Sequence, residues 1–564
     1  MHRSTSRSGQ IGRATAVAQS TSRRAAALGA GAIVASLVAS CLGTVGAPGG
    51  GGGPSASVSG SSGSYTLLPA RIRRLSNAEF DTTTHALLGT NQTFASNLPT
   101  DVRQGSYNAG GFPAAGFTRN AAAVFDTVSA PQIGQAAASL AKEAVQNLSK
   151  IAPCTGPSNT ACAKSFIESF GPRAYRRPLT ADEVTGLLGI YQAGVKDQTY
   201  GDGIELVIAT ILQSAGFLYL TELGGTPSNG AAELTSYEVA SALSYFLTGG
   251  PPDDTLMQAA AANALQAPQA VGAQATRLLK ASSMAQLAVF VEQWLGIDTP
   301  PGSSTGTVVS SAEMTSETTA FIEDVMTSGD GSVGTLLSSP SSFVDGPLAT
   351  LYGLSAPGGS GFSKVANAQR PGLLNQASFL STYAHSSFSA PIKRGHLVRT
   401  QMLCEQIPPP SPGLMVNVSP PLPTAAQTTR QADMEHMSSP ACAGCHTLMD
   451  PIGWGFENFD GNGAYRTTEA GMTIDASGTV YAAAEVSGPF TGNADLIGKL
   501  STSKTVEQCY LTRFADFAAA TTDPGIESSF MTFWQTQPAA VQKNLPELVV
   551  AFVESEMFLM RATP

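Results

Sequence analysis

The sequence predicts a mainly α-helical protein, and two observations support this. First, four segments begin with a Ser or Thr that is followed three positions later by Glu, a spacing that lets both side chains satisfy free amides at a helix N-terminus. The four pairs are Ser76 with Glu79, Thr180 with Glu183, Thr235 with Glu238 and Ser310 with Glu313. Second, apolar residues in the stretches behind these pairs recur at intervals of three and four and stop at glycine, as in amphipathic helices.

The N-terminal residues 1–40 are expected to be an export signal of the lipoprotein type. Arginines precede the apolar stretch 25–38, whose 14 residues are fewer than the about 20 that cross a bilayer. The Val-Ala-Ser before Cys41 resembles a bacterial lipoprotein box, in which Cys41 becomes lipidated. Ordinary signal-peptidase cleavage nearby is the alternative. We expect a periplasmic or cell-surface lipoprotein of the outer membrane, anchored to the membrane through its lipid.

The composition indicates a soluble, secreted protein that does not bind nucleic acid. Charged residues make up 13% of the chain, against a usual value of about 25%. The 31 Lys and Arg face 41 Asp and Glu, a net charge of −10 that repels a phosphate backbone. At 564 residues the chain has room for several domains of about 150 residues each.

Cys442, Cys445 and His446 form a Cys-x-x-Cys-His motif, the attachment signature of c-type haem. Two thiolates about one helical turn apart can form thioethers with the two vinyl groups of one porphyrin, and the next side chain then points at the iron. We therefore expect covalent haem c, with His446 as the proximal ligand of the iron. The alternatives are a zinc site, for which no second ligand pair follows, and a redox disulfide, for which a thioredoxin-like context is missing.

The distal ligand of the iron decides whether the haem carries electrons or binds small molecules. No single candidate stands out from the sequence, and ligands close to His446 along the chain are expected to reach the opposite haem face with difficulty. The candidates are Met434, His436, Met437, Met449, Met472 and His385.

The remaining cysteines are even in number, which suits disulfides in an oxidising compartment. Setting aside Cys41 and the haem motif leaves four. Cys154 and Cys162 are close enough to close a small loop. Cys404 and Cys509 are then the remaining pair, with two free buried thiols as the alternative.

Clusters of Pro and Gly divide the chain into a multi-domain helical platform followed by a small cytochrome c-like haem segment with a short β hairpin. Alternation around Ser477-Gly478 predicts that hairpin. The expected segments are a flexible Gly/Ser linker over 41–65, helical domains over 66–150, 151–225 and 226–355, a haem-binding domain over 356–470, and the hairpin plus a C-terminal helical domain over 471–564.

Other polar residues near the motif carry weaker signals. Asp450, Glu457 and Asp460 lack the spacing of a calcium loop, so we expect solvated or helix-capping carboxylates. Arg394 and Arg466 could pair with haem propionates, although exposed arginines are the simpler expectation.

The order of several blocks resembles the multi-domain cytochrome c proteins of planctomycetes and myxobacteria, which are built from a fixed series of domains of unknown function. The blocks include "RAYRRPLTADEV", "LTSYEVASALSYFLTGGPPD", "PIKRGHLVRTQMLCEQIPPP" and "HMSSPACAGCHTLMDPIGWGFENFD". The resemblance implies a secreted, predominantly helical redox protein with haem at Cys442, Cys445 and His446. It supplies neither a settled substrate nor catalytic residues.

The expected function is single-electron transfer with an extracytoplasmic redox partner protein. Two rivals stay open: a haem enzyme such as a peroxidase or oxidase, and a surface polysaccharide-binding protein whose haem is structural. Whether the protein is an enzyme is therefore left open by the sequence.

Overall fold

The computed structural model describes residues 57–60, 63–94, 97–104, 116–119, 129–154, 159–196, 198–303, 306–359, 361–385, 388–407 and 426–563. All of them lie in one compact unit, Pro54–Pro564. The expected export signal, Cys41 and most of the expected linker lie outside the described residues.

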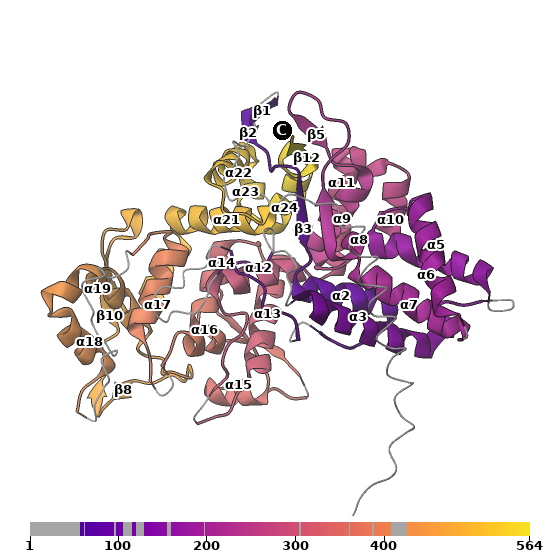
Figure 1. Ribbon diagram of the computed structural model, residues 1–564. Coiled ribbons are helices and arrows are strands. Elements are labelled where there is room, and N and C mark those ends of the chain that lie inside the picture. The colour runs from indigo at the N-terminus through magenta and orange to yellow at the C-terminus, as the bar shows by residue number, and fades with distance from the viewer. Residues whose placement is uncertain are drawn as a thin grey trace, which may run out of the picture. The chain divides into compact units, whose positions relative to one another are not determined.

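The described chain is mainly helical, as the sequence predicts, with strands only in short two-stranded sheets (Figure 1). A first group of helices surrounds a core of its own, in which α7 packs against α3, α5 and α6. Its helices are α2 Asn77–Leu88, α3 Ser129–Ala144, α4 Leu148–Ile151, α5 Thr160–Tyr175, α6 Ala181–Gly194, α7 Tyr200–Gln213 and α8 Ala215–Leu218.

A second and larger core joins the rest of the chain, from Tyr65 near its start to Phe558 near its end. The middle helices are α9 Ser236–Thr248, α10 Asp254–Ala261, α11 Pro268–Ala281, α12 Ala285–Leu295, α13 Ser311–Thr327, α14 Val333–Ser338, α15 Gly346–Leu351 and α16 Ala377–Thr382. The later helices are α17 Pro391–Leu397, α18 Thr429–Met437, α19 Pro440–Gly453, α20 Gly492–Ser501, α21 Lys504–Ala519, α22 Pro524–Thr536, α23 Ala539–Lys543, α24 Leu545–Val553 and α25 Glu556–Leu559. The long helix α21 contacts α12, α14 and α22, and so links the middle helices to the C-terminal ones (Figure 1).

All four expected helix starts are confirmed as capping boxes. Ser76, Thr180, Thr235 and Ser310 each accept a hydrogen bond from the amide three residues on, and the Glu at that position accepts one from the cap amide. Two more boxes occur, at Thr199 with Asp202 and at Thr428 with Gln431. They depart from the Ser or Thr with Glu pattern, because Asp and Gln fill the role of Glu here.

Each end of the described unit pairs with a strand from the middle of the chain in a short antiparallel sheet. Strand β3 Arg71–Arg74 pairs with β4 Tyr219–Glu222, and β12 Met560–Ala562 pairs with β5 Ala231–Glu233. A parallel bridge joins Pro69 to Ala562. Two further antiparallel pairs are β1 Ser57–Gly60 with β2 Gly63–Thr66, and β6 Ser341–Val344 with β7 Ser363–Ala366.

The hairpin expected around Ser477-Gly478 exists, but its turn is elsewhere. Strand β10 Ser477–Val480 begins at the expected turn and pairs with β11 Gly488–Thr491, while β8 Thr468–Glu469 and β9 Met472–Thr473 form a separate tight hairpin. The glycine serves close packing and not chain reversal. A Cβ at Gly478 would lie 2.1 Å from the carbonyl oxygen of Pro451, so β10 can lie against α19 only because this residue has no side chain.

Candidate haem attachment site

Helix α19 places Cys442, Cys445 and His446 on one face. Positions i, i+3 and i+4 of a helix are neighbours on its surface, and all three side chains are partly exposed. Both cysteines are free thiols, and neither forms a disulfide. The helix begins with Pro440, whose missing amide hydrogen costs nothing at a first position. The three residues of the motif are therefore presented together at the surface.

Glycine contacts fix the position of α19 against α17. A Cβ at Gly395 of α17 would lie 1.8 Å from the Met449 carbonyl oxygen, and one at Gly453 of α19 would lie 1.9 Å from the Pro391 carbonyl oxygen. Any side chain at either position would push the helices apart. The C-terminal half of the motif helix is thus packed closely against α17.

A buried carboxylate orients His446. The Nδ1 atom of His446 lies 2.9 Å from Oδ2 of Asp450, one helical turn further on. Asp450 is fully buried, and burial raises its pKa while the contact with His446 works in the opposite direction. With Nδ1 as the hydrogen-bond donor to the carboxylate, the neutral imidazole keeps its lone pair on Nε2.

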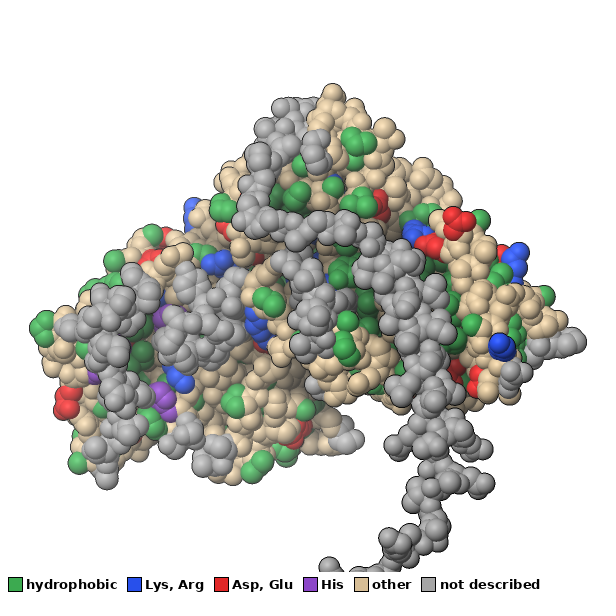
Figure 2. Space-filling model, viewed as in Figure 1, with side chains coloured by type: hydrophobic (Ala, Val, Ile, Leu, Met, Phe, Trp, Pro, Cys, Tyr) green, Lys and Arg blue, Asp and Glu red, His purple; other side chains and the backbone are tan. Residues whose placement is uncertain are grey.

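The Nε2 atom of His446 faces a second histidine. It lies 3.3 Å from Nε2 of His436 in α18, and the two rings meet edge to face with centroids 4.5 Å apart. Burial, followed by the neighbouring His446, lowers the pKa of His436. A neutral His436 can offer a lone pair of its own to a metal. Figure 2 shows histidine side chains at the surface of the region that carries α18 and α19 in Figure 1.

The other distal candidates from the sequence are placed differently. Met434 is exposed, Met449 is buried, and the Met437 side chain is half-buried at the end of α18. The sulfur of Met472 lies 3.9 Å from Nε2 of Gln431. His385 packs against the ring of Phe388, and burial lowers its pKa to about 4. Among the described residues, His436 is the candidate for which a contact with His446 is observed.

The donor set suits a covalently bound haem. Two free thiols one turn apart and an imidazole with an available Nε2 are the groups that haem c attachment uses. Within the described residues, no group of three or more His, Cys, Asp or Glu is arranged to hold a metal ion.

Three protein families of unknown function match successive parts of the chain. PSD5 (DUF1595) matches residues 162–222, PSD4 (DUF1592) matches 234–354 and PSCyt3 (DUF1588) matches 370–469. The chain carries these three domains in series. The PSCyt3 domain contains α17, α18 and α19 with the Cys-x-x-Cys-His sequence, and the family names point to a cytochrome-related multi-domain protein. No curated protein and no solved structure matches the chain. The three matched ranges lie within the expected segments 151–225, 226–355 and 356–470, respectively. The exact boundaries of these segments stay predictions.

The two arginines considered as partners of haem propionates, Arg394 and Arg466, are engaged within the protein. Arg394 is fully buried, so the expectation of an exposed side chain is wrong, because its guanidinium group serves backbone carbonyls. The acceptors are the carbonyl oxygens of Leu380, Tyr383, Phe456, Phe459 and Asp460. Arg466 donates to Glu457, Glu469 and Ser389. The segment that follows α19 is therefore tied to α16 and α17.

Two of the carboxylates expected to be solvated are buried instead. Glu457 is 1% exposed, and burial raises its pKa to about 7 against the opposing effect of Arg466 and Arg394. Asp450 is buried because it holds His446. Asp460 is partly exposed and accepts from the amides of Asn462 and Ala464, a turn-forming role.

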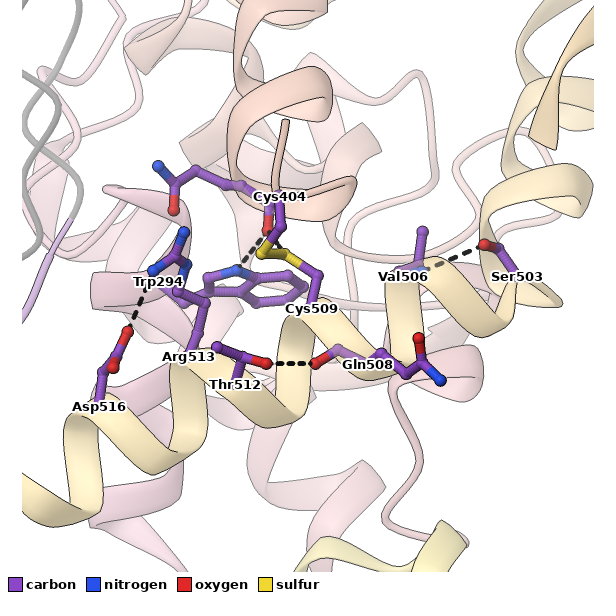
Figure 3. Close-up of a disulfide and its surroundings, with 10 residues drawn as sticks. Trp294, Cys404, Ser503, Val506, Gln508, Cys509, Thr512, Arg513 and Asp516 are labelled. Atoms are coloured by element: carbon purple, nitrogen blue, oxygen red, sulfur yellow. Dashed lines mark hydrogen bonds and ion pairs between the residues drawn. A yellow bond between two sulfur atoms is a disulfide. The ribbon is translucent and has the colours of Figure 1, made fainter. Parts of the chain in front are cut away.

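A disulfide ties the PSCyt3 domain to α21. Both expected pairs are formed, Cys154 with Cys162 and Cys404 with Cys509. The second pair joins the chain after the π-helical turn η5 Val398–Met402 to α21 (Figure 3). Beside it, the indole of the buried Trp294 donates a 2.8 Å hydrogen bond to the Gln401 carbonyl oxygen. Closing this bond makes a loop of the chain that contains α18 and α19.

Proposed function

We propose that the protein is an exported c-type cytochrome that carries one covalently attached haem and exchanges single electrons with an extracytoplasmic redox partner. The observation that supports this most strongly is the pairing of two free, partly exposed thiols with an imidazole whose Nδ1 is held by Asp450. The series of three domains supports the resemblance to multi-domain cytochrome c proteins.

Each residue of the site has a distinct role in this proposal. Cys442 and Cys445 would form the thioethers, and His446 would bind the iron through Nε2. Asp450 accepts the Nδ1 hydrogen, which fixes the ring orientation and makes Nε2 more basic. The bound haem would supply one-electron iron chemistry.

His436 is our choice for the second axial ligand. Its Nε2 lies 3.3 Å from Nε2 of His446. Two imidazole ligands occupy both axial positions and leave none for peroxide or oxygen. This arrangement favours electron transfer over the rival function as a haem enzyme. Two histidines also give a lower potential than a histidine with a methionine.

We further propose that Cys41 is lipidated and anchors the protein at the outer membrane, facing the periplasm or the cell exterior. None of the helices in the described part of the chain has the length and hydrophobicity needed to cross a bilayer. Covalent haem attachment in bacteria takes place outside the cytoplasm. The proposal of export and the proposal of covalent haem are therefore consistent with each other.

A redox titration followed by visible spectroscopy tests the proposal. The protein is produced with the haem maturation machinery and titrated in both directions with mediators. Reversible, single-electron reduction and oxidation, with no spectral change on adding cyanide or azide, is the expected result. Ready binding of either anion to the resting protein would instead favour the haem enzyme.

A further inference from the structure

Four arginine side chains converge in the interior where the ends of the described unit meet. Arg71 and Arg73 come from β3, Arg561 from β12, and Arg119 from the segment 116–119. Their side chains are 16%, 4%, 2% and 8% exposed, respectively. Charged groups this deeply buried need partners of opposite charge.

Two carboxylates accompany these four guanidinium groups. Glu222 of β4 lies between Arg71 and Arg561, with its Oε2 2.8 Å from Nε of each. Glu79 of α2 accepts from both terminal nitrogens of Arg73, at 2.7 and 2.9 Å. The cluster of four arginines and two glutamates therefore holds an excess of two positive charges.

Arg119 is the member of this cluster that lacks a close partner. Its nearest carboxylate oxygen is Oε1 of Glu79 at 4.0 Å. Its Nε is buried and has no hydrogen-bond partner among the described residues. The guanidinium lies over the ring of Phe517, 4.6 Å from the centroid. Burial and then the repulsion of Arg73 lower the pKa of Arg119 to about 10.

A small cavity lies among these arginines. Arg71, Arg73, Arg119, Glu222 and Arg561 line it, together with apolar side chains. The cavity has a volume of about 20 Å³ for water-sized spheres. This is enough for one such sphere. The apolar part of the wall comprises Leu68, Ala242, Phe246, Ala518, Ala520, Phe552, Met557 and Phe558.

We propose that this cavity binds one small inorganic anion, a halide of the size of chloride. The excess of buried positive charge and the unpartnered Nε of Arg119 call for a negative group, and the volume excludes a polyatomic ligand such as a nucleotide or a sugar. The anion bridges guanidinium groups from β3, β12 and the segment 116–119. It thereby stabilises the contact between the two ends of the described unit.

Thermal unfolding in two salts tests the site without depending on haem. The full-length protein is unfolded in sodium chloride and in sodium gluconate at equal ionic strength, because gluconate is too large for the cavity. Chloride should raise Tm saturably, by about 2 °C. Arg119→Met should lose this difference, and Arg277→Met, which removes an exposed ion pair with Asp253, should keep it. Equal Tm values of the unmodified protein in both salts would overturn the proposal.

Diffraction from crystals grown in bromide gives an answer that does not require the Arg119→Met variant to fold. An anomalous bromide peak in the cavity beside Arg119 is the expected result. Density for a water molecule without anomalous signal would contradict the proposal.

Discussion

The Nε2 atoms of His436 and His446 lie 3.3 Å apart. The two residues are 10 positions apart in the chain and belong to consecutive helices, α18 and α19, with Ser438 and Ser439 between them. The chain reverses over these two serines, so side chains near the facing ends of the helices meet.

Replacing His436 by Ala should open one axial position of the haem. The variant is expected to bind cyanide readily and to change its visible spectrum, while Met437→Ala, one residue further along α18, should behave like the unmodified protein. Cyanide titration followed by absorbance measures both. An H436A variant that keeps a six-coordinate spectrum and refuses cyanide would show that another residue is the distal ligand.

The disulfide between Cys404 and Cys509 should contribute more to stability than the one between Cys154 and Cys162. The first links residues 105 positions apart and the second residues 8 apart, and chain-entropy estimates make the longer loop worth about 2 kcal/mol more. Denaturant unfolding of the two double Cys→Ser variants checks this. Equal losses of unfolding free energy would mean that loop entropy does not govern the effect.

Glu317 should make the protein less stable as the pH rises from about 4.5 to 8. It is fully buried and accepts a 2.5 Å hydrogen bond from the Tyr352 hydroxyl, and burial raises its pKa to about 8. At pH values between the unfolded and the folded pKa of Glu317, the folded state holds a proton that the unfolded state has lost. The contribution of Glu317 to the free energy of unfolding is therefore full at low pH and is lost as the pH rises.

Glu317→Gln removes this titration and keeps a neutral side chain of the same shape. The free energy of unfolding should then fall less steeply between pH 5 and 8, by up to about 1.4 kcal/mol per pH unit. Urea unfolding across this pH range measures the slope. Glu168→Gln on the exposed face of α5 is the control and should leave the slope unchanged. Identical slopes for Glu317→Gln and the unmodified protein would contradict the assignment.

Local signals in the sequence were sufficient for four helix starts, and counting the cysteines was sufficient for the disulfides. The Ser or Thr with Glu pattern found four helix starts because a capping box involves only neighbouring residues. Pairing Cys404 with Cys509 followed from counting alone.

Features that depend on distant contacts could not be predicted in this way. The contact between His436 and His446 was not predicted, because the sequence pattern does not show how α18 and α19 lie against each other. The sequence pattern did not show that Gly478 makes room for the Pro451 carbonyl oxygen of α19. Arg394 was expected at the surface, although its five carbonyl partners come from two separate segments.

The mass of the intact exported protein tests the central proposal most directly. Protein produced with the haem maturation machinery should carry the added mass of one haem that survives denaturation. The double variant Cys442→Ala with Cys445→Ala should lack this mass, and its free energy of unfolding without haem should change by only about 0.5 kcal/mol, since both thiols are free and partly exposed. A colourless unmodified protein without the added mass, produced beside a correctly matured control cytochrome, would contradict the account.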